Sequence, residues 1–345
     1  MKKAISILLS LALAVGLLTG CSAASTPDSG SKKLRIVTTI FPEYDWVREI
    51  LGDQADHVEL TMLLDDGVDL HSFQPTADDM IAISNCDLFL YTGGESDSWV
   101  EDALASASNT DLVAMNLMEV LGDGVKVEEA VEGMQESEHH HHEEEEHHED
   151  SHEHHEDCDH TSECTHNHDD EHIWLSLKHA AVLCNAIAET LSSIDPAHQV
   201  TYSENAAAYI QKLSDLDGQY QAAVDAASIH TLLFADRFPF RYLADDYGLT
   251  YYAAFSGCSA ETEASFETVS FLAGKVDELS LPCVLTIEGA THNIAQTVVE
   301  NTNTKDQKIL VLDSMQSVTA SDVEAGVTYL AIMQQNLETL KTALG

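Results

Sequence analysis

Four side chains that could bind a metal ion stand at the ends of predicted strands in this 345-residue chain. His71 follows the apolar run VELTMLL, His172 precedes a predicted helix, and Asp236 and Asp313 end the runs TLLFAD and KILVLD. Imidazole nitrogens and carboxylate oxygens are ligands that zinc and manganese both accept in proteins. The alternative for each residue alone is a surface or capping role, and that alternative is stronger for the aspartates.

A run of histidine and acid occupies residues 136–171, directly before His172. It has no apolar face, so we predict a mobile loop rather than a folded element. Histidine-rich tracts bind metal, which makes an accessory metal-binding role the better interpretation than a solvated insertion without function. The accessory histidines would be His139, His140, His141, His142, His147, His148, His152, His154, His155, His160, His166 and His168.

Elements that alternate between strand and helix must position the four candidate ligands. Apolar, β-rich runs alternate with helical patterns over 34–195 and again over 228–345, and one long helical pattern fills 196–227. This order predicts an α/β fold of two lobes with parallel sheets, joined by one long rigid helix. Ligands of such sheets bind beyond the carboxyl ends of the strands, so we expect the metal site in the cleft between the lobes. The predicted strands cover 34–40, 58–64, 87–93, 112–119, 231–236, 249–255, 283–289 and 308–314.

The amino-terminal residues indicate export. Residues 1–20 combine two lysines with a short apolar stretch, as a secretory signal peptide does. They end in LTG before Cys21, which resembles the bacterial lipoprotein processing box. We therefore predict that Cys21 is lipidated, that 21–33 is a flexible tether, and that the body lies outside the cytoplasm on the cell membrane.

Exported proteins can form disulfides, and six cysteines remain beside Cys21. Cys158 and Cys164 could close a small loop, and Cys258 with Cys283 is a second candidate pair. The sequence alone does not fix these pairings. Free, buried thiols are the alternative for the other two cysteines.

The charge balance excludes some partners. The chain has 60 acidic against 15 basic residues and a formal net charge of −45. Such a surface repels nucleic acid and anionic lipid and attracts cations. We therefore expect no nucleic-acid partner.

Several segments resemble one family. GVDLHSFQPTADDM, DEHIWLSLKHA, PAHQVTYSENAAAYIQKLSDLD and YLADDYGL are similar to the metal-binding solute-binding proteins of ABC importers, the zinc and manganese cluster. The resemblance implies two lobes on a long helix, and one ion that is passed to a membrane permease with its ATPase. It also implies His71 and His172 as ligands, and Asp313 as a ligand in manganese members. Because zinc members often carry a histidine-rich loop, zinc is favoured over manganese.

The third ligand position of that family falls on Arg237, which cannot bind a metal because its guanidinium stays protonated. Three interpretations remain open. Asp236 could coordinate while Arg237 pairs with an acid such as Glu288, the ion could have only His71, His172, Asp313 and water, or the site could take no bare cation. We favour the first two together. Glu288 itself could line the cleft as a ligand or serve as an ion-pair partner.

The sequence thus predicts a monomeric, non-enzymatic zinc-binding lipoprotein of an importer. The alternatives are a surface lipoprotein for metal storage or adhesion and a component of a manganese importer. A metallohydrolase is disfavoured because the segment HIWLSLKH, which begins at His172, lacks the glutamate and the spacing of an HExxH motif.

Overall fold

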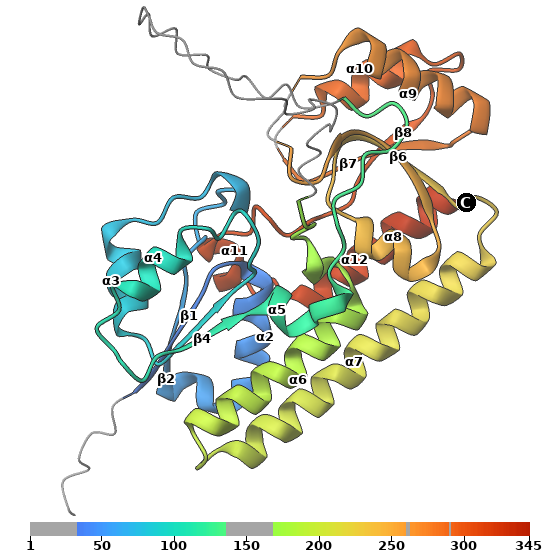
Figure 1. Ribbon diagram of the computed structural model, residues 1–345. Helices are drawn as coiled ribbons and strands as arrows, with labels where there is room; N and C mark the ends of the chain where they lie inside the picture. The colour runs from blue at the N-terminus through green and yellow to red at the C-terminus, as the bar shows by residue number, and fades with distance from the viewer. Residues whose placement is uncertain (1–32, 136–167, 260–262, 290) are drawn as a thin grey trace, which may run out of the picture. The chain divides into compact units, whose positions relative to one another are not determined.

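Two parallel four-stranded sheets form the framework of the protein (Figure 1). The computed structural model describes residues 33–135, 168–259, 263–289 and 291–345. The strand order is β2-β1-β3-β4 in the first sheet and β6-β5-β7-β8 in the second, so the two lobes repeat one topology. The predicted α/β fold with two parallel-sheet lobes is confirmed. The strands are β1 (Leu34–Thr38), β2 (Val58–Met62), β3 (Leu88–Tyr91), β4 (Val113–Asn116), β5 (Thr231–Phe238), β6 (Thr250–Ser256), β7 (Cys283–Thr286) and β8 (Lys308–Val311).

Helices connect and flank the strands of each sheet. Those before the long helix α7 are α2 (Phe41–Leu51), α3 (Ala77–Asn85), α4 (Val100–Ala105), α5 (Leu117–Leu121) and α6 (Leu177–Ile194), with 3₁₀ turns η1 (Gly52–His57), η2 (Leu70–Ser72), η3 (Gly122–Gly124) and η4 (Ile173–Leu175). Those after it are α8 (Arg241–Tyr247), α9 (Phe266–Leu279), α10 (Asn293–Asn301), α11 (Ala320–Glu324) and α12 (Tyr329–Leu344). Among the described residues, no helix is long and apolar enough to cross a bilayer.

Local sequence signals explain where these elements lie. The side chain of Thr76 accepts a hydrogen bond from Asp79 N, and the Asp79 carboxylate accepts one from Thr76 N. This reciprocal pair satisfies amide groups that the first turn of α3 leaves free. Leu88, Phe89 and Leu90 of β3 are fully buried, as expected for a strand in a sheet that is covered on both faces.

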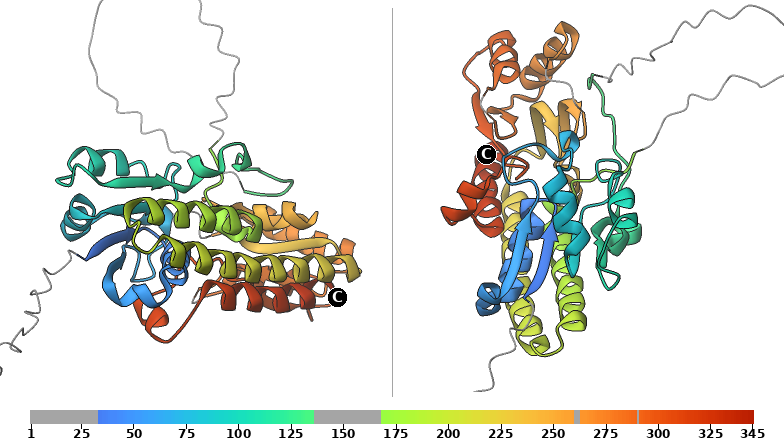
Figure 2. Two further views of the ribbon diagram at one scale, coloured as in Figure 1. Left: turned by 90° about the horizontal axis from the view of Figure 1, so that it is seen from below. Right: turned by 90° about the vertical axis from the view of Figure 1, so that its left-hand side faces the viewer.

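The long helix α7 spans Gln199–Ala226, close to the predicted 196–227. At 1.5 Å per residue its 28 residues extend about 42 Å. Its buried residues recur every three or four positions from Tyr202 to Val224, so one face packs along its length. Figure 2 shows α7 lying between α6 and α12, and both helices contact it.

The carboxy-terminal segment returns from the second lobe to the first. Thr319 forms an isolated antiparallel bridge with Asp66 after β2. At the start of α12, the Tyr329 amide donates to Asp45 Oδ2 of α2, and the Tyr329 hydroxyl donates to the Trp174 carbonyl of η4. Both lobes are therefore connected by this segment as well as by α7.

Some predicted details differ. Residues 112–119 were predicted as one strand, but the strand ends at Asn116, whose side chain accepts from Glu119 N and starts α5. The candidate disulfide between Cys258 and Cys283 does not form, because both thiols are free. Cys283 begins β7 whereas Cys258 follows the end of β6, and since the sheet is parallel these positions lie at opposite edges of it.

Candidate metal centre

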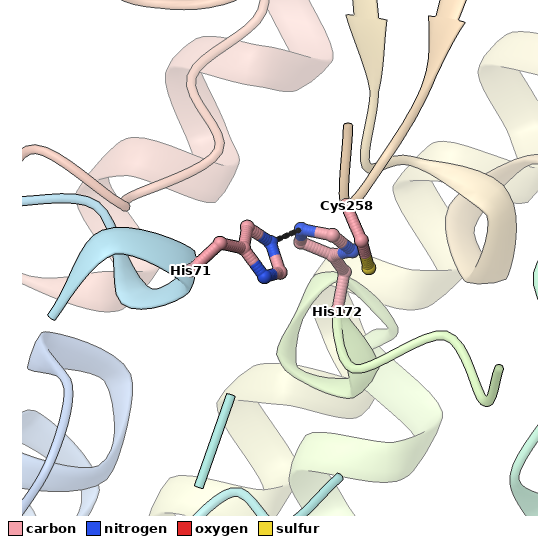
Figure 3. Close-up of side chains that lie close together, drawn as sticks. All are labelled: His71, His172 and Cys258. Atoms are coloured by element: carbon pink, nitrogen blue, oxygen red, sulfur yellow. Dashed lines mark hydrogen bonds between the residues drawn. The ribbon is translucent and has the colours of Figure 1, made fainter. Parts of the chain in front are cut away.

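The carboxyl ends of the two sheets bring His71, His172 and Cys258 together. One ligand atom from each residue lies within 4.8 Å of the others. In Figure 3 the two imidazoles point toward each other, and Cys258 approaches beside His172 from the other lobe. Nitrogen and sulfur donors at this spacing are typical of a zinc site.

His71 is held by the 3₁₀ turn that follows β2. Asp69 caps this turn, because its Oδ1 accepts from His71 N at 3.0 Å. The imidazole Nδ1 lies 2.8 Å from Ser96 Oγ and 3.4 Å from Glu171 Oε2. Gly94 makes room for this carboxylate, since a Cβ at its φ of +82° would lie 2.4 Å from Glu171 Oε1.

His172 is fully buried and directly precedes η4. Its Nδ1 lies 2.9 Å from Asp170 Oδ1, and the same oxygen accepts from the His172 amide at 2.9 Å. The next turn is fixed to the second lobe, because the Trp174 indole N–H donates to the Ser314 carbonyl at 2.8 Å. The orientation of the His172 ring is thus set by bonds on both sides.

The Nε2 atoms of the two histidines face each other. Nε2 of His71 and Nε2 of His172 are 3.2 Å apart. Nδ1 of His172 faces Asp170 Oδ1, which only accepts, and Nδ1 of His71 lies near Ser96 Oγ and Glu171 Oε2; with the ring protons on Nδ1, both Nε2 atoms present lone pairs to each other. Two nitrogens that bind the same tetrahedral zinc ion, each at about 2.0–2.1 Å, are about 3.4 Å apart. A cation between the two Nε2 atoms would therefore relieve their repulsion at nearly the observed spacing.

Acidic groups surround the imidazoles. Burial raises the pKa of Glu171, but the hydrogen bonds from His71 and Ser96 outweigh burial and hold this pKa below its ordinary value. Glu171 is therefore ionised at neutral pH and favours a cation at His71. A carboxylate behind each metal-binding histidine is a common arrangement in protein metal sites, since it fixes the tautomer and raises ligand basicity.

Comparison with known proteins places the chain in a family. Residues 36–343 match the family described as "Zinc-uptake complex component A periplasmic". The chain belongs to this zinc-uptake family.

Relatives of the zinc-uptake family extend over most of the chain. The "Zinc-binding lipoprotein AdcA" of Streptococcus pneumoniae (strain ATCC BAA-255 / R6) is 31% identical over 339 residues, which cover 98% of this chain but 60% of that protein. The "High-affinity zinc uptake system protein ZnuA" of Bacillus subtilis (strain 168) is 29% identical over 331 residues, 95% of this chain and 94% of that one. The chain thus spans about 60% of the length of the first of these relatives.

Solved structures of the zinc-uptake family share the fold. The Zn(II)-bound ZnuA-like domain of Streptococcus pneumoniae AdcA matches with a TM-score of 0.66 and 26% identity, over 91% of this chain and 99% of that one. The metal-dependent lipoprotein YcdH of Bacillus subtilis matches with a TM-score of 0.68 and 25% identity, over 90% of this chain and 99% of that one.

Arg237, which the resemblance implied at the third ligand position, is paired across the two lobes. Its Nη2 donates to Asp69 Oδ2 at 2.6 Å, and its Nη1 donates to the Ser259 carbonyl at 3.4 Å. The prediction that Arg237 pairs with Glu288 is therefore wrong. Its partner is Asp69, which caps the turn that carries His71. Burial raises the pKa of Asp69, but the hydrogen bond and the charge of Arg237 outweigh burial and hold this pKa below its ordinary value.

The three predicted acidic ligands lie outside the cluster formed by His71, His172 and Cys258. Asp236 Oδ2 accepts from the Thr286 hydroxyl, and Glu288 accepts from Ser314 N, Ser314 Oγ and Gln316 N. Asp313 Oδ1 accepts from Met315 N at 2.8 Å, and burial, with the nearby charge of Glu288, raises the pKa of Asp313 to about 6. Their roles as ligands stay predictions.

A cavity of about 340 Å³ lies next to these acids. Asp69, Asp236, Arg237, Glu288 and His292 are among its lining residues. The cavity therefore extends from the Asp69–Arg237 ion pair to the carboxyl ends of β5 and β7. This is the position at which a parallel sheet of this order is expected to bind a ligand.

The sequence interpretation missed Cys258. Its signal was the same one that identified His71, since Cys258 stands just beyond a predicted strand. It was assigned to a disulfide instead. Of the accessory histidines in 136–171, the structure describes His168, whose Nδ1 lies 2.9 Å from Glu95 Oε2. The other accessory histidines lie outside the described residues, as do Cys21, Cys158 and Cys164.

Removing the carboxylate behind His172 should weaken metal binding. In Asp170→Ala the Nδ1 proton loses its acceptor and the ring loses its fixed orientation, so we expect zinc affinity to fall about 10- to 100-fold. Competition with a zinc chelator measures this effect. Asp170→Asn keeps an acceptor oxygen and should lose less. Affinity within twofold of the unmodified protein in Asp170→Ala would contradict the assignment.

Proposed function

We propose that this chain is an extracytoplasmic zinc-binding protein that captures one zinc ion between its lobes and delivers it to an ABC permease. The observation that carries the proposal is the pair of Nε2 atoms at 3.2 Å, each ring backed by a carboxylate. Membership of the zinc-uptake family and the names of its relatives support the same function.

The donor set supports zinc over manganese. Two imidazole nitrogens face each other, and a thiol stands near them. Manganese favours carboxylate, carbonyl and water oxygens, whereas imidazole and thiolate favour zinc. The nearest carboxylates, Asp170 and Glu171, are positioned behind the imidazole rings at Nδ1.

Anchoring and partners belong to the proposal. Lipidation at Cys21 would hold the folded body at the membrane through the tether 21–33, near the permease that receives the ion. The permease would be served by its ATPase, and the binding protein would act as a monomer. The histidine-rich run would supply zinc to the main site without forming it.

Reconstitution of transport tests the function. The zinc-loaded chain should stimulate ATP hydrolysis and zinc accumulation by its permease in proteoliposomes, whereas metal-free chain should not. A manganese-loaded chain serves as the control for metal identity and should be inactive. Several weak zinc sites, no tight site and no stimulation of the permease would favour a storage or adhesion protein instead.

A further inference from the structure

We infer that the Cys258 thiolate is the third protein ligand of the ion held by His71 and His172. The inference rests on the proposed function and specifies the chemistry of the same site. It makes the site one of two nitrogens and one sulfur, with a fourth position for water or another oxygen donor.

The backbone around Cys258 is fixed against the histidine pair. A Cβ on Gly257 would lie 3.0 Å from His172 Cε1 and 3.0 Å from the Phe238 carbonyl oxygen, so glycine lets the chain pass close to the ring without crowding it. The Cys258 amide donates to Glu128 Oε1 at 2.9 Å, which ties the residue to the segment before the histidine-rich run. The side chain is consequently held at the edge of His172 (Figure 3).

Arg237 cannot bind the ion itself, so the second lobe must supply its ligand from another residue. Arg237 on β5 directs its guanidinium toward Asp69 and the Ser259 carbonyl. Asp236 beside it accepts from Thr286, so its carboxylate is engaged with β7. In the described part of the chain, Cys258 is the second-lobe member of the cluster, and it joins two histidines that precede α7.

The distances allow coordination after a small adjustment. A tetrahedral zinc bound to nitrogen at about 2.0–2.1 Å and to sulfur at about 2.3 Å places these ligand atoms about 3.6 Å apart. The ligand atoms of the cluster already lie within 4.8 Å. Rotation of the Cys258 side chain toward the two Nε2 atoms would bring the sulfur into the site.

Binding through sulfur has a chemical consequence. The Cys258 S–H bond breaks as the zinc–sulfur bond forms, and the proton passes to water, so each zinc bound releases one proton from this residue. No oxidant or reductant is needed. The thiolate is a soft ligand, so this residue would select zinc over manganese and calcium.

Cobalt substitution tests the inference directly. We would use the full chain carrying Cys21→Ser, Cys158→Ser and Cys164→Ser as the parent, with Co²⁺ below one equivalent so that the tightest site fills first. A cysteine-bound Co²⁺ shows a sulfur-to-metal charge-transfer band in the near ultraviolet. We expect this band in the parent and in the matched control Cys283→Ser, a buried free thiol at the other edge of the sheet. Cys258→Ser should lack it and should bind zinc at least tenfold more weakly.

The outcomes separate this inference from the proposed function. Absence of the band from the parent overturns the inference without any variant having to fold. A band that persists in Cys258→Ser, or zinc affinity there within twofold of the parent, also overturns it. If His71→Ala and His172→Ala still abolish tight binding in those cases, the proposed function stands. Unchanged affinity in both histidine variants would reject the proposed function and this inference together.

Discussion

His172→Ala should abolish tight zinc binding, with affinity falling on the order of a thousandfold or more. The side chain is fully buried, and its Nε2 directly faces that of His71 at 3.2 Å. Zinc sites with few protein ligands depend on each ligand for several kcal/mol, and each 1.4 kcal/mol is about tenfold in affinity. Alanine also leaves the Asp170 carboxylate without the imidazole that links it to the ion. Competition with a tight zinc chelator measures the loss.

The matched variants make this prediction specific. His71→Ala should show a loss of similar size, because it removes the opposing nitrogen. His198→Ala is the control, since that histidine lies before α7 and pairs with Asp195 at 2.6 Å. It should leave zinc affinity unchanged. Tight binding that survives in either His71→Ala or His172→Ala would reject that residue as a ligand.

Stability should fall as pH rises through neutrality, largely because of Glu43. This side chain is fully buried, and burial, with the charge of Asp97, raises the pKa of Glu43 to about 8. Between about pH 4.5 and 8 the folded protein retains a proton that the unfolded chain releases. The folded state therefore loses stability across this window as pH increases. Each pKa unit corresponds to about 1.4 kcal/mol, so the loss should be on the order of a few kcal/mol.

Urea unfolding in the presence of a metal chelator would measure this slope at pH 5, 6.5 and 8. Glu43→Gln keeps one acceptor oxygen for the Thr39 amide, and its NH2 group can donate to the Thr92 hydroxyl, but it cannot ionise, so the stability of this variant should change less with pH. Some slope should remain, because burial also raises the pKa of Asp97 to about 7 and that of Asp45 to about 6. A slope in Glu43→Gln equal to that of the unmodified protein would contradict the role of Glu43.

Much of the fold was predictable because it depends on local patterns. Apolar β-rich runs such as 34–40 and 58–64 predict parallel strands, and the three- to four-residue spacing of apolar side chains in 199–226 predicts the long helix. His172 was found from its place before a predicted helix and from the resemblance of DEHIWLSLKHA. His71 was found for a reason related to the strands. A residue just beyond a strand must lie at the carboxyl edge of its sheet, whatever the details of packing.

The parts that failed depend on contacts between distant segments. The partner of Arg237 is Asp69, 168 positions away in sequence, and no local pattern selects it over Glu288. The role of Cys258 depends on how closely Gly257 passes His172, which is a property of lobe packing. A cysteine in an exported protein was interpreted as half of a disulfide, and strand direction in the folded sheet excludes that pairing.

The central claim is that the main zinc site is built at the strand ends and not by the histidine-rich run. The direct test is elemental analysis of a chain in which residues 137–167 are replaced by a short glycine–serine linker, purified without added metal. We predict one zinc per chain, retained through dialysis against a chelator of intermediate strength. Loss of the zinc with the run, leaving a folded protein that cannot retain one equivalent, would contradict the account.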